Sequence, residues 1–372
     1  MKTLASALLG LCACAPPAQP ALPSSPPAGS SFSSQDAPSS SPLVRPKGGP
    51  RFERAFEEAY NGHWPCRGAG GLVFCVRNSV SFGIDEDEGH VVHVRIDLAR
   101  NERRVVGLST SLEGQYVSDG TDVYAVGESG LDRMPRSLGP IELAQPLPGL
   151  REAKDVDVAV AGKDVWLRSR RGDSWRFAGW HIGEPQPFAE LTHPRHADDD
   201  TTFIAGHGRI EFLDGEGSRV AFDVASRKSG VTRLPTDVTP ISGPGKLAMN
   251  AKESFWVAWS DDGAPSTKWQ ILAVSAADDA ARVVYEETTP EKSPSTPGPF
   301  AIIADDAHVY FLRWKIPRGE SGIELMRLPV EGGKPEHLGR MFEHGYASMW
   351  FDGDALYVSG SASGTIYRWW RR

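Results

Sequence analysis

Gly120-Thr121-Asp122-Val123-Tyr124 is one copy of a short pattern in which a tight turn leads directly into a strand. Turn-forming Gly and Asp come first, and apolar residues with a high strand propensity follow. The pattern recurs at residues 70–74, 162–166, 207–211, 252–256, 306–310 and 353–357. The last residues of successive copies are 42 to 54 positions apart, and all of them are aromatic except Glu211. The chain is therefore a repeat with a period of about 47 residues.

Each copy is followed by a second pair of predicted strands. The clearest example alternates polar and apolar residues over 323–329, turns at 331–334 and continues through 335–338. About four short strands per repeat, bounded by turn residues, are typical of the blades of a β-propeller. Seven copies predict an all-β fold with seven blades of about four antiparallel strands each, or six blades if the first copy is only partial.

The repeats also resemble a known group of proteins. From Arg51 onward they are similar to the blades of secreted bacterial β-propellers of the TolB-like and PQQ-repeat-like kind. The resemblance implies the propeller fold. It does not extend to quinone binding, because the aspartate and threonine-glycine strand ending of quinone-binding blades is missing from this sequence.

The two ends of the repeat region are predicted to meet. The chain stops directly after the third strand of the last copy, at residues 365–370, so the last blade lacks a fourth strand. Residues 43–60 are the candidate for that strand, since closure of the ring removes an exposed sheet edge. Within them, Phe52, Phe56 and Tyr60 recur at a spacing of four, which predicts a short capping helix over residues 52–60.

The first residues of the chain have the pattern of an export signal. Lys2 precedes an apolar run that ends at Ala13, which is typical of a secretory signal peptide over residues 1–13. The run closes with Leu11-Cys12-Ala13-Cys14, which resembles the lipobox of bacterial lipoproteins. This resemblance implies that Cys14 is lipidated and, because no Asp follows it, that the protein is carried to the outer membrane. Cleavage and release into the periplasm or the medium is the alternative.

A polar segment separates this signal from the repeats. Residues 15–50 contain ten Pro and nine Ser and few apolar side chains. Such a segment cannot offset the entropy cost of ordering by burying apolar surface. We therefore expect residues 14–50 to be a disordered linker and residues 51–372 to be the propeller domain.

The charge balance excludes one class of partner. The chain has 48 acidic and 40 basic side chains and a formal net charge of −8, whereas proteins that bind nucleic acid usually carry a basic face. No run of 18 apolar residues is present, so we expect membrane contact through the lipid anchor only.

Cys66 and Cys75 are the two cysteines of the predicted domain. A two-residue turn at Gly70-Gly71 would pair them directly across one hairpin. Their Cα atoms would then be about 4.5 Å apart, within the range of disulfides. In an exported protein such a pair is expected to form a disulfide, and a redox or metal-binding role is the alternative.

Candidate binding residues lie in three places. A His- and Asp-rich stretch between the third and fourth blades could bind a divalent cation, with Ca²⁺ favoured by oxygen ligands; it contains His193, His196, Asp198, Asp199 and Asp200. A loop of the first blade, either simply solvated or a contact for a cationic partner, contains Asp85, Glu86, Asp87 and Glu88. Trp269 and Trp314 lie beside long loops, where an exposed indole could stack on a sugar or peptide, although strand aromatics usually pack in the core.

The sequence contains no nucleophile elbow, Walker loop or HExxH motif, so no catalytic residue is assigned. We expect an exported, lipid-anchored binding scaffold, with an envelope or extracellular protein as its first partner class. The alternatives are a metal-dependent hydrolase or lyase that uses the His- and Asp-rich stretch, and a glycan-binding propeller that uses the loop tryptophans.

Overall fold

The computed structural model describes most of the predicted propeller domain. The described residues are 51–56, 66–78, 91–109, 111–127, 129–137, 140–148, 150, 154–194, 203–214, 217–235, 239–241, 245–260, 266–289, 298–314, 322–341, 347–360 and 365–371. They belong to the second of the two units into which contacts divide the chain, Pro38–Arg372. The predicted signal peptide, Cys14 and the linker lie outside them. The described ranges contain no helix, and hence none long and apolar enough to cross a membrane.

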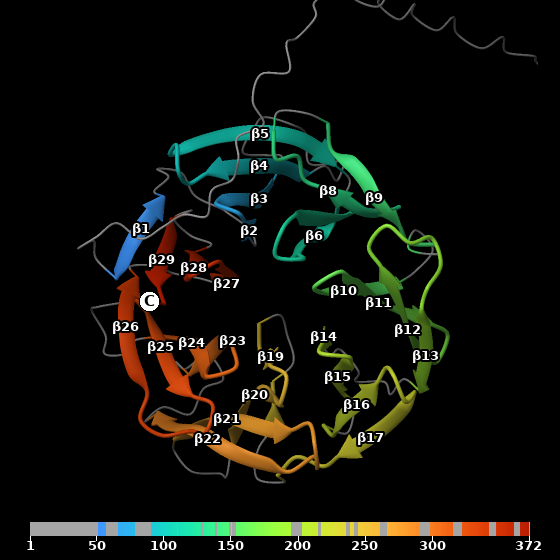
Figure 1. The fold of residues 1–372 in the computed structure, drawn as a ribbon. Coiled ribbons are helices and arrows are strands. Elements are labelled where there is room, and N and C mark those ends of the chain that lie inside the picture. The colour runs from blue at the N-terminus through green and yellow to red at the C-terminus, as the bar shows by residue number, and fades with distance from the viewer. Residues whose placement is uncertain are drawn as a thin grey trace, which may run out of the picture. The chain divides into compact units, whose positions relative to one another are not determined.

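Seven antiparallel sheets form a ring, which confirms the seven-bladed β-propeller (Figure 1). Blade 1 consists of β2 (Cys66–Ala69), β3 (Leu72–Asn78), β4 (Val91–Asp97) and β5 (Glu102–Ser109). Blade 2 consists of β6 (Ser111–Ser118), β7 (Val123–Gly127), β8 (Gly130–Arg133) and β9 (Glu142–Pro146). Blade 3 consists of β10 (Lys154–Ala161), β11 (Asp164–Arg171), β12 (Ser174–His181) and β13 (Ala189–Pro194). Blade 4 consists of β14 (Ile204–Gly206), β15 (Arg209–Leu213), β16 (Arg219–Asp223) and β17 (Lys228–Thr232).

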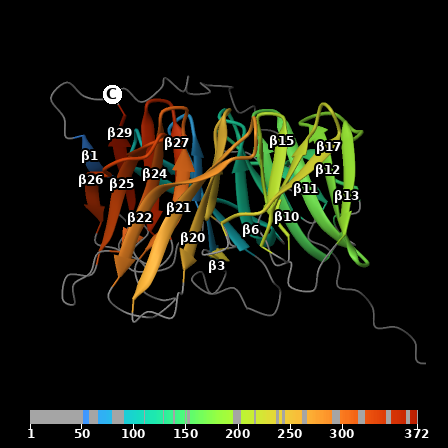
Figure 2. The same cartoon turned by 90° about the horizontal axis from the view of Figure 1, so that it is seen from below.

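The other three blades complete the ring. Blade 5 has two short inner segments, β18 (Thr239–Pro240) and β19 (Leu247–Met249), which both pair with β20 (Glu253–Ser260), followed by β21 (Thr267–Ser275) and β22 (Ala281–Thr289). Blade 6 consists of β23 (Pro299–Ala304), β24 (His308–Trp314), β25 (Ile323–Pro329) and β26 (Glu336–Met341). Blade 7 consists of β27 (Ala347–Asp352), β28 (Ala355–Gly360), β29 (Ile366–Trp370) and β1 (Phe52–Phe56). From the side, the strands run between the two ends of the ring (Figure 2).

Burial changes from the second strand of a blade to the fourth. The second strands β7, β15 and β28 are buried at every residue, because neighbouring blades cover both faces of the sheet. This burial explains their unbroken apolar runs. The fourth strand β17 is mostly exposed. The core therefore consists of layers between adjacent blades, such as the layer of Phe177 and Phe212, whose rings stack 4.8 Å apart between blades 3 and 4.

The predicted closure of the ring is confirmed. Strand β1 pairs antiparallel with β29 and supplies the fourth strand of blade 7. The backbone N–H of Trp370 donates to the carbonyl of Arg51 at 2.9 Å. The carboxylate of Glu53 accepts from Arg368 at 2.6 Å and from the indole N–H of Trp370 at 3.0 Å.

The predicted capping helix is wrong for the part of it that the structure describes. Residues Phe52–Phe56 form a strand, and Tyr60 lies outside the described residues. A spacing of four would place Phe52 and Phe56 on one face of a regular strand as well as of a helix. Here an extra residue, Ala55, interrupts the register. Phe52 therefore packs with blade 6, and Phe56 packs on the opposite face with blade 1.

The same kind of irregularity recurs around the ring. In blades 1, 2, 5, 6 and 7 the outermost strand carries one residue more than its partner, which makes a β-bulge; the extra residues are Val106, Ala144, Val284, Leu338 and Ala55. Bulges on outermost strands twist the exposed edge and hinder pairing with another chain. The outermost strands of blades 3 and 4, β13 and β17, have a regular register.

The predicted hairpin in blade 1 is confirmed residue by residue. Cys66 lies opposite Cys75, and the two form a disulfide with a Cα–Cα distance of 4.3 Å. Gly70 and Gly71 form the turn at φ values of 61° and 80°, in the left-handed region that such turns require.

Glu211, the one residue at the end of the repeated pattern that is not aromatic, forms a buried ion pair. Glu211 is completely buried and receives two hydrogen bonds from the guanidinium of Arg219 in the next strand, at 2.7 and 2.8 Å. Arg219 also bonds the carboxylate of Asp279 in blade 5 at 2.6 Å. A charged network thus replaces an aromatic ring between blades 4 and 5.

Replacing Arg219 by Met should lower the free energy of unfolding by about 3–5 kcal/mol, because Glu211 would keep its buried charge without its main partner. Chemical denaturation measures the loss. The double variant with Glu211→Leu should regain part of it, since the unpaired buried carboxylate is then absent, while Arg209, 3.4 Å from Glu211, loses its own carboxylate partner. The control Arg176→Met, which breaks an exposed ion pair with Glu190, should change stability by less than about 1 kcal/mol. Equal losses in R219M and R176M would contradict this role.

Candidate ligand-binding site

The structure brings together few of the residues predicted to bind a metal. His193 lies in β13, where its ring packs 5.1 Å from that of Phe212. His196, Asp198, Asp199 and Asp200 lie outside the described residues, as do Asp85, Glu86, Asp87 and Glu88. Within the described ranges, no three His, Cys, Asp or Glu side chains are placed to hold a metal ion.

The two candidate tryptophans differ. Trp269 lies inside β21 and is only 5% exposed, packed among core residues between blades 5 and 6. Its prediction as a surface contact is therefore wrong, because the strand extends further toward the loop than the sequence pattern indicated. Trp314 ends β24, is half-buried and stacks on Phe300 with ring centroids 5.2 Å apart.

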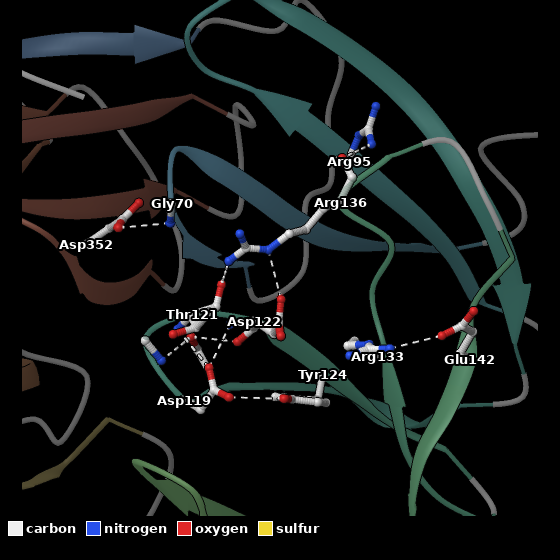
Figure 3. A network of polar contacts seen from close by, with 12 residues as sticks. Gly70, Arg95, Asp119, Thr121, Asp122, Tyr124, Arg133, Arg136, Glu142 and Asp352 are labelled. Carbon is white, nitrogen blue, oxygen red and sulfur yellow. Dashed lines mark hydrogen bonds and ion pairs between the residues drawn. The ribbon is translucent and has the colours of Figure 1, made fainter. Parts of the chain in front are cut away.

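At one end of the ring, an aspartate holds the turn between two strands by hydrogen bonds, and this arrangement recurs. These bonds were not predicted from the sequence. In this turn, between the first and second strands of blade 2, Asp119 Oδ1 accepts from the backbone N–H groups of Thr121 and Asp122 at 2.7 and 2.6 Å. Its Oδ2 accepts from the hydroxyl of Tyr124 at 3.0 Å (Figure 3). The carboxylate thus fixes both the turn and the strand that follows.

Blade 6 repeats this arrangement. Asp305 accepts from the N–H groups of Ala307 and His308 at 3.0 and 2.8 Å, and from the hydroxyl of Tyr310 at 3.1 Å. We call the end of the ring that carries these turns, at 119–122 and 305–308, the turn face. It also carries the contact between blades 7 and 1, where Asp352 accepts from Gly70 and Gly71 at 3.0 and 2.7 Å (Figure 3).

The match between blades 2 and 6 extends to the third and fourth strands. Tyr124 lies opposite Arg133, which forms an ion pair with Glu142 at 3.0 Å (Figure 3). In the same register Tyr310 lies opposite Arg327, which forms an ion pair with Glu336 in β26.

The arginine that covers the turn distinguishes the two blades. In blade 2, Arg136 of the β8–β9 connection bonds Asp122 at 2.8 Å and the carbonyl of Thr121, while Arg95 of blade 1 donates to the carbonyl of Arg136 (Figure 3). In blade 6 the equivalent of Asp122 is His308. The arginine there, Arg371, comes from the end of blade 7.

A pocket of about 240 Å³ opens at this place on the turn face. It is lined by Asp305, His308, Tyr310, Arg327 and Arg371, and we call it the closure pocket, since Arg371 follows the strand that closes the ring. Arg371 bonds Asp305 at 3.2 Å and the carbonyl of Gly353 at 2.7 Å.

Aromatic rings support the two guanidinium groups. That of Arg371 lies 4.7 Å from the centre of the Phe351 ring. That of Arg327 lies 5.3 Å from the centre of the Trp369 ring. Such stacking holds a guanidinium in place without using its N–H groups.

The protonation states of the pocket follow from its contacts. Burial opposes ionisation of Asp305, but hydrogen bonds from Ala307, His308 and Tyr310 outweigh it and hold the pKa of the carboxyl below its ordinary value. Burial, together with the charge of Asp305, raises the pKa of Tyr310 to about 12. At neutral pH the pocket therefore presents one carboxylate, two guanidinium groups and a neutral phenol. This set can orient a polar group of a ligand.

A second perturbed group belongs to the framework. His93 in β4 is completely buried, and its Nδ1 lies 2.5 Å from the hydroxyl of Tyr116 in blade 2. Burial lowers the pKa of His93 to about 4. A perturbed pKa often marks a functional site, but this imidazole has no exposed surface and joins two blades.

The stability of the protein should consequently fall in acid through His93. The unfolded chain takes up the proton near pH 6.5 and the folded chain only near pH 4, so stability is lost as the pH falls between these values. The loss is about 3 kcal/mol. Thermal unfolding from pH 8 to pH 4 should show a shallower decline for His93→Gln than for the natural protein. The control His207→Asn, at an exposed turn residue, should follow the natural protein; a parallel decline of H93Q would contradict the assignment.

No protein-family model matches the chain, and no curated protein matches it. Among solved structures it is similar to U3-55K (12% identical, covering 87% of this chain and 100% of that one, TM-score 0.54). It is also similar to the β-propeller domain of the trilobed protease from Pyrococcus furiosus (10%, 84% and 94%, 0.52) and to an oligogalacturonate lyase in complex with manganese (10%, 85% and 98%, 0.51). At these identities the likeness shows the fold alone. The Pyrococcus domain has an open velcro topology, whereas β1 closes the present ring on β29.

Proposed function

We propose that this protein is a binding scaffold whose turn face recognises a protein partner, with the closure pocket at the centre of the contact. The observation that carries the proposal is the composition and support of that pocket. Arg and Tyr are among the side chains most enriched at the energetic centres of protein interfaces. Here Arg327, Arg371 and Tyr310 meet in one pocket, and each is held by a bond or a ring contact to the framework.

The rigidity of the surroundings favours binding. A side chain that is fixed before the partner arrives loses little conformational entropy on binding. Asp305 is fixed by three donors, and Arg371 by Asp305, Gly353 and Phe351. The partner chemistry that fits best is a polar or acidic side chain that can accept from the guanidinium groups.

A photo-crosslinking amino acid at position 308 should therefore give discrete adducts in cells, and Arg371→Ala should reduce them about tenfold, the effect of losing a central arginine. Blade 2 offers the matched control, since Arg133 is the equivalent of Arg327: Arg327→Ala should weaken the adducts and Arg133→Ala should not. The same crosslinker at Val231, 63% exposed on the outermost strand of blade 4, reports unspecific contacts. Equal adducts from 231 and 308, or adducts indifferent to R371A, would refute the proposed surface.

We propose separately that the protein acts at the outer membrane. Residues 1–13 would direct export, Cys14 would carry the lipid, and residues 14–50 would tether the propeller to the outer membrane. The disulfide of Cys66 and Cys75 supports export, because such bonds persist in oxidising compartments.

Replacing Cys14 by Ser should remove incorporated palmitate label and release the protein from the membrane fraction. The adjacent Cys12→Ser is the matched control and should keep both the label and the membrane association. Label retained in C14S, or lost equally in both variants, would show that Cys14 is not the lipidated residue.

A further inference from the structure

At the end of the ring opposite the turn face, a lysine of blade 5 lies against blade 6. Lys246 directly precedes β19, the innermost strand of blade 5, and is half-buried. Its backbone carbonyl accepts from Val257, and the preceding residue, Gly245, accepts from Ile302 of blade 6 at 2.7 Å. These bonds fix the lysine against β23. Among the described residues no carboxylate lies within ion-pair distance of its ammonium group, which is 5.8 Å from the centre of the Phe300 ring.

This lysine differs from the buried cation in blade 4. Arg219 has two carboxylate partners, whereas among the described residues the Lys246 ammonium group contacts an aromatic ring and no carboxylate. Desolvation by burial lowers the pKa of Lys246 to about 8, and no titratable group of the described residues opposes this shift. Taking an ammonium group out of water without a partner is unfavourable unless a ligand supplies the opposite charge.

An aromatic pair lies beside the lysine. Phe300 stacks on Trp314 at 5.2 Å, and both rings are half-buried, so the pair keeps part of its surface open. Trp269 lies against Gly298, two residues before Phe300: a Cβ at Gly298 would come within 2.0 Å of its indole. The indole N–H of Trp269 is buried, so this tryptophan belongs to the core and is closed to a ligand.

We infer that Lys246, Phe300 and Trp314 form a binding site for a carboxylate whose ring presents a face that packs on an aromatic side chain, either a sugar acid or an aromatic acid. The ammonium group supplies the charge, and the ring pair supplies a stacking surface. Phe300 lies five residues along β23 from Asp305, which is about 16 Å at the rise of a strand. The site is therefore separate from the closure pocket and does not depend on the function proposed for it.

Saturation-transfer NMR with glucuronate and with benzoate tests this site, with glucose and benzyl alcohol as uncharged counterparts. At least one acid should bind more tightly than its neutral counterpart, and comparing the two acids tells a sugar acid from an aromatic acid. Lys246→Met should weaken that binding at least tenfold. This variant should fold, since Met is similar in length and removes a buried charge, and thermal unfolding verifies that it does. The control Lys268→Met, which removes an exposed lysine paired with Glu286, should bind like the natural protein.

The pH dependence of ligand binding distinguishes a binding role of Lys246 from a purely structural one. Binding to the natural protein should decline as the pH rises through 8, where Lys246 loses its proton. Lys246→Arg keeps its charge above pH 12 and should hold the acid up to pH 10. Equal binding of acids and neutral counterparts, full binding by K246M, or the same pH profile in K246R and the natural protein would each overturn the assignment.

Discussion

The pairing of β1 with β29 is the interaction on which the rest of the molecule depends. It joins residues separated by more than three hundred positions and removes the open edge that blade 7 would otherwise present. Its side chains reinforce the backbone ladder, since Glu53 binds both Arg368 and Trp370, and Arg368 stacks over Trp370 at 4.4 Å. Because each blade is buried by its two neighbours, closing the last blade completes the apolar layers on both of its faces.

The closure pocket is a consequence of this pairing. Blades 2 and 6 share the same turn, with Asp119 and Asp305 in equivalent positions, and both place a tyrosine and an arginine in the same register. In blade 2 an arginine of the same blade covers the turn. In blade 6 the arginine is Arg371, which reaches Asp305 only because β29 is held between β28 and β1. The same turn occurs in both blades, and in blade 6, where the ring closes, it forms part of the closure pocket.

The sequence predicts the parts of this structure that follow from local rules. The repeat period predicts seven blades, with six as the alternative, and the Gly70-Gly71 turn predicts the register of Cys66 and Cys75. The missing last strand predicts closure by a segment within residues 43–60. The predicted helix is wrong at Phe52–Phe56, because this segment pairs as a strand with β29, and a local pattern contains no information on that distant partner. The closure pocket lies beyond prediction for a similar reason. Its residues come from the turn before β24, from β24 and β25, and from the segment after β29, and only the ring brings them together.

The burial of the Lys246 ammonium group also could not be predicted from the sequence. Its sequence neighbours give no sign that the ammonium group is desolvated, since the contacts that cover it come from β23, where the ring of Phe300 lies 5.8 Å away. The two sites lie at opposite ends of β23, and they share no side chain. Effects of changes at such separated positions usually add. A scaffold of stacked blades can therefore hold a polar pocket at one end and a cationic aromatic site at the other, because each relies on its own turn and strand ends while the buried second strands between them stay fixed.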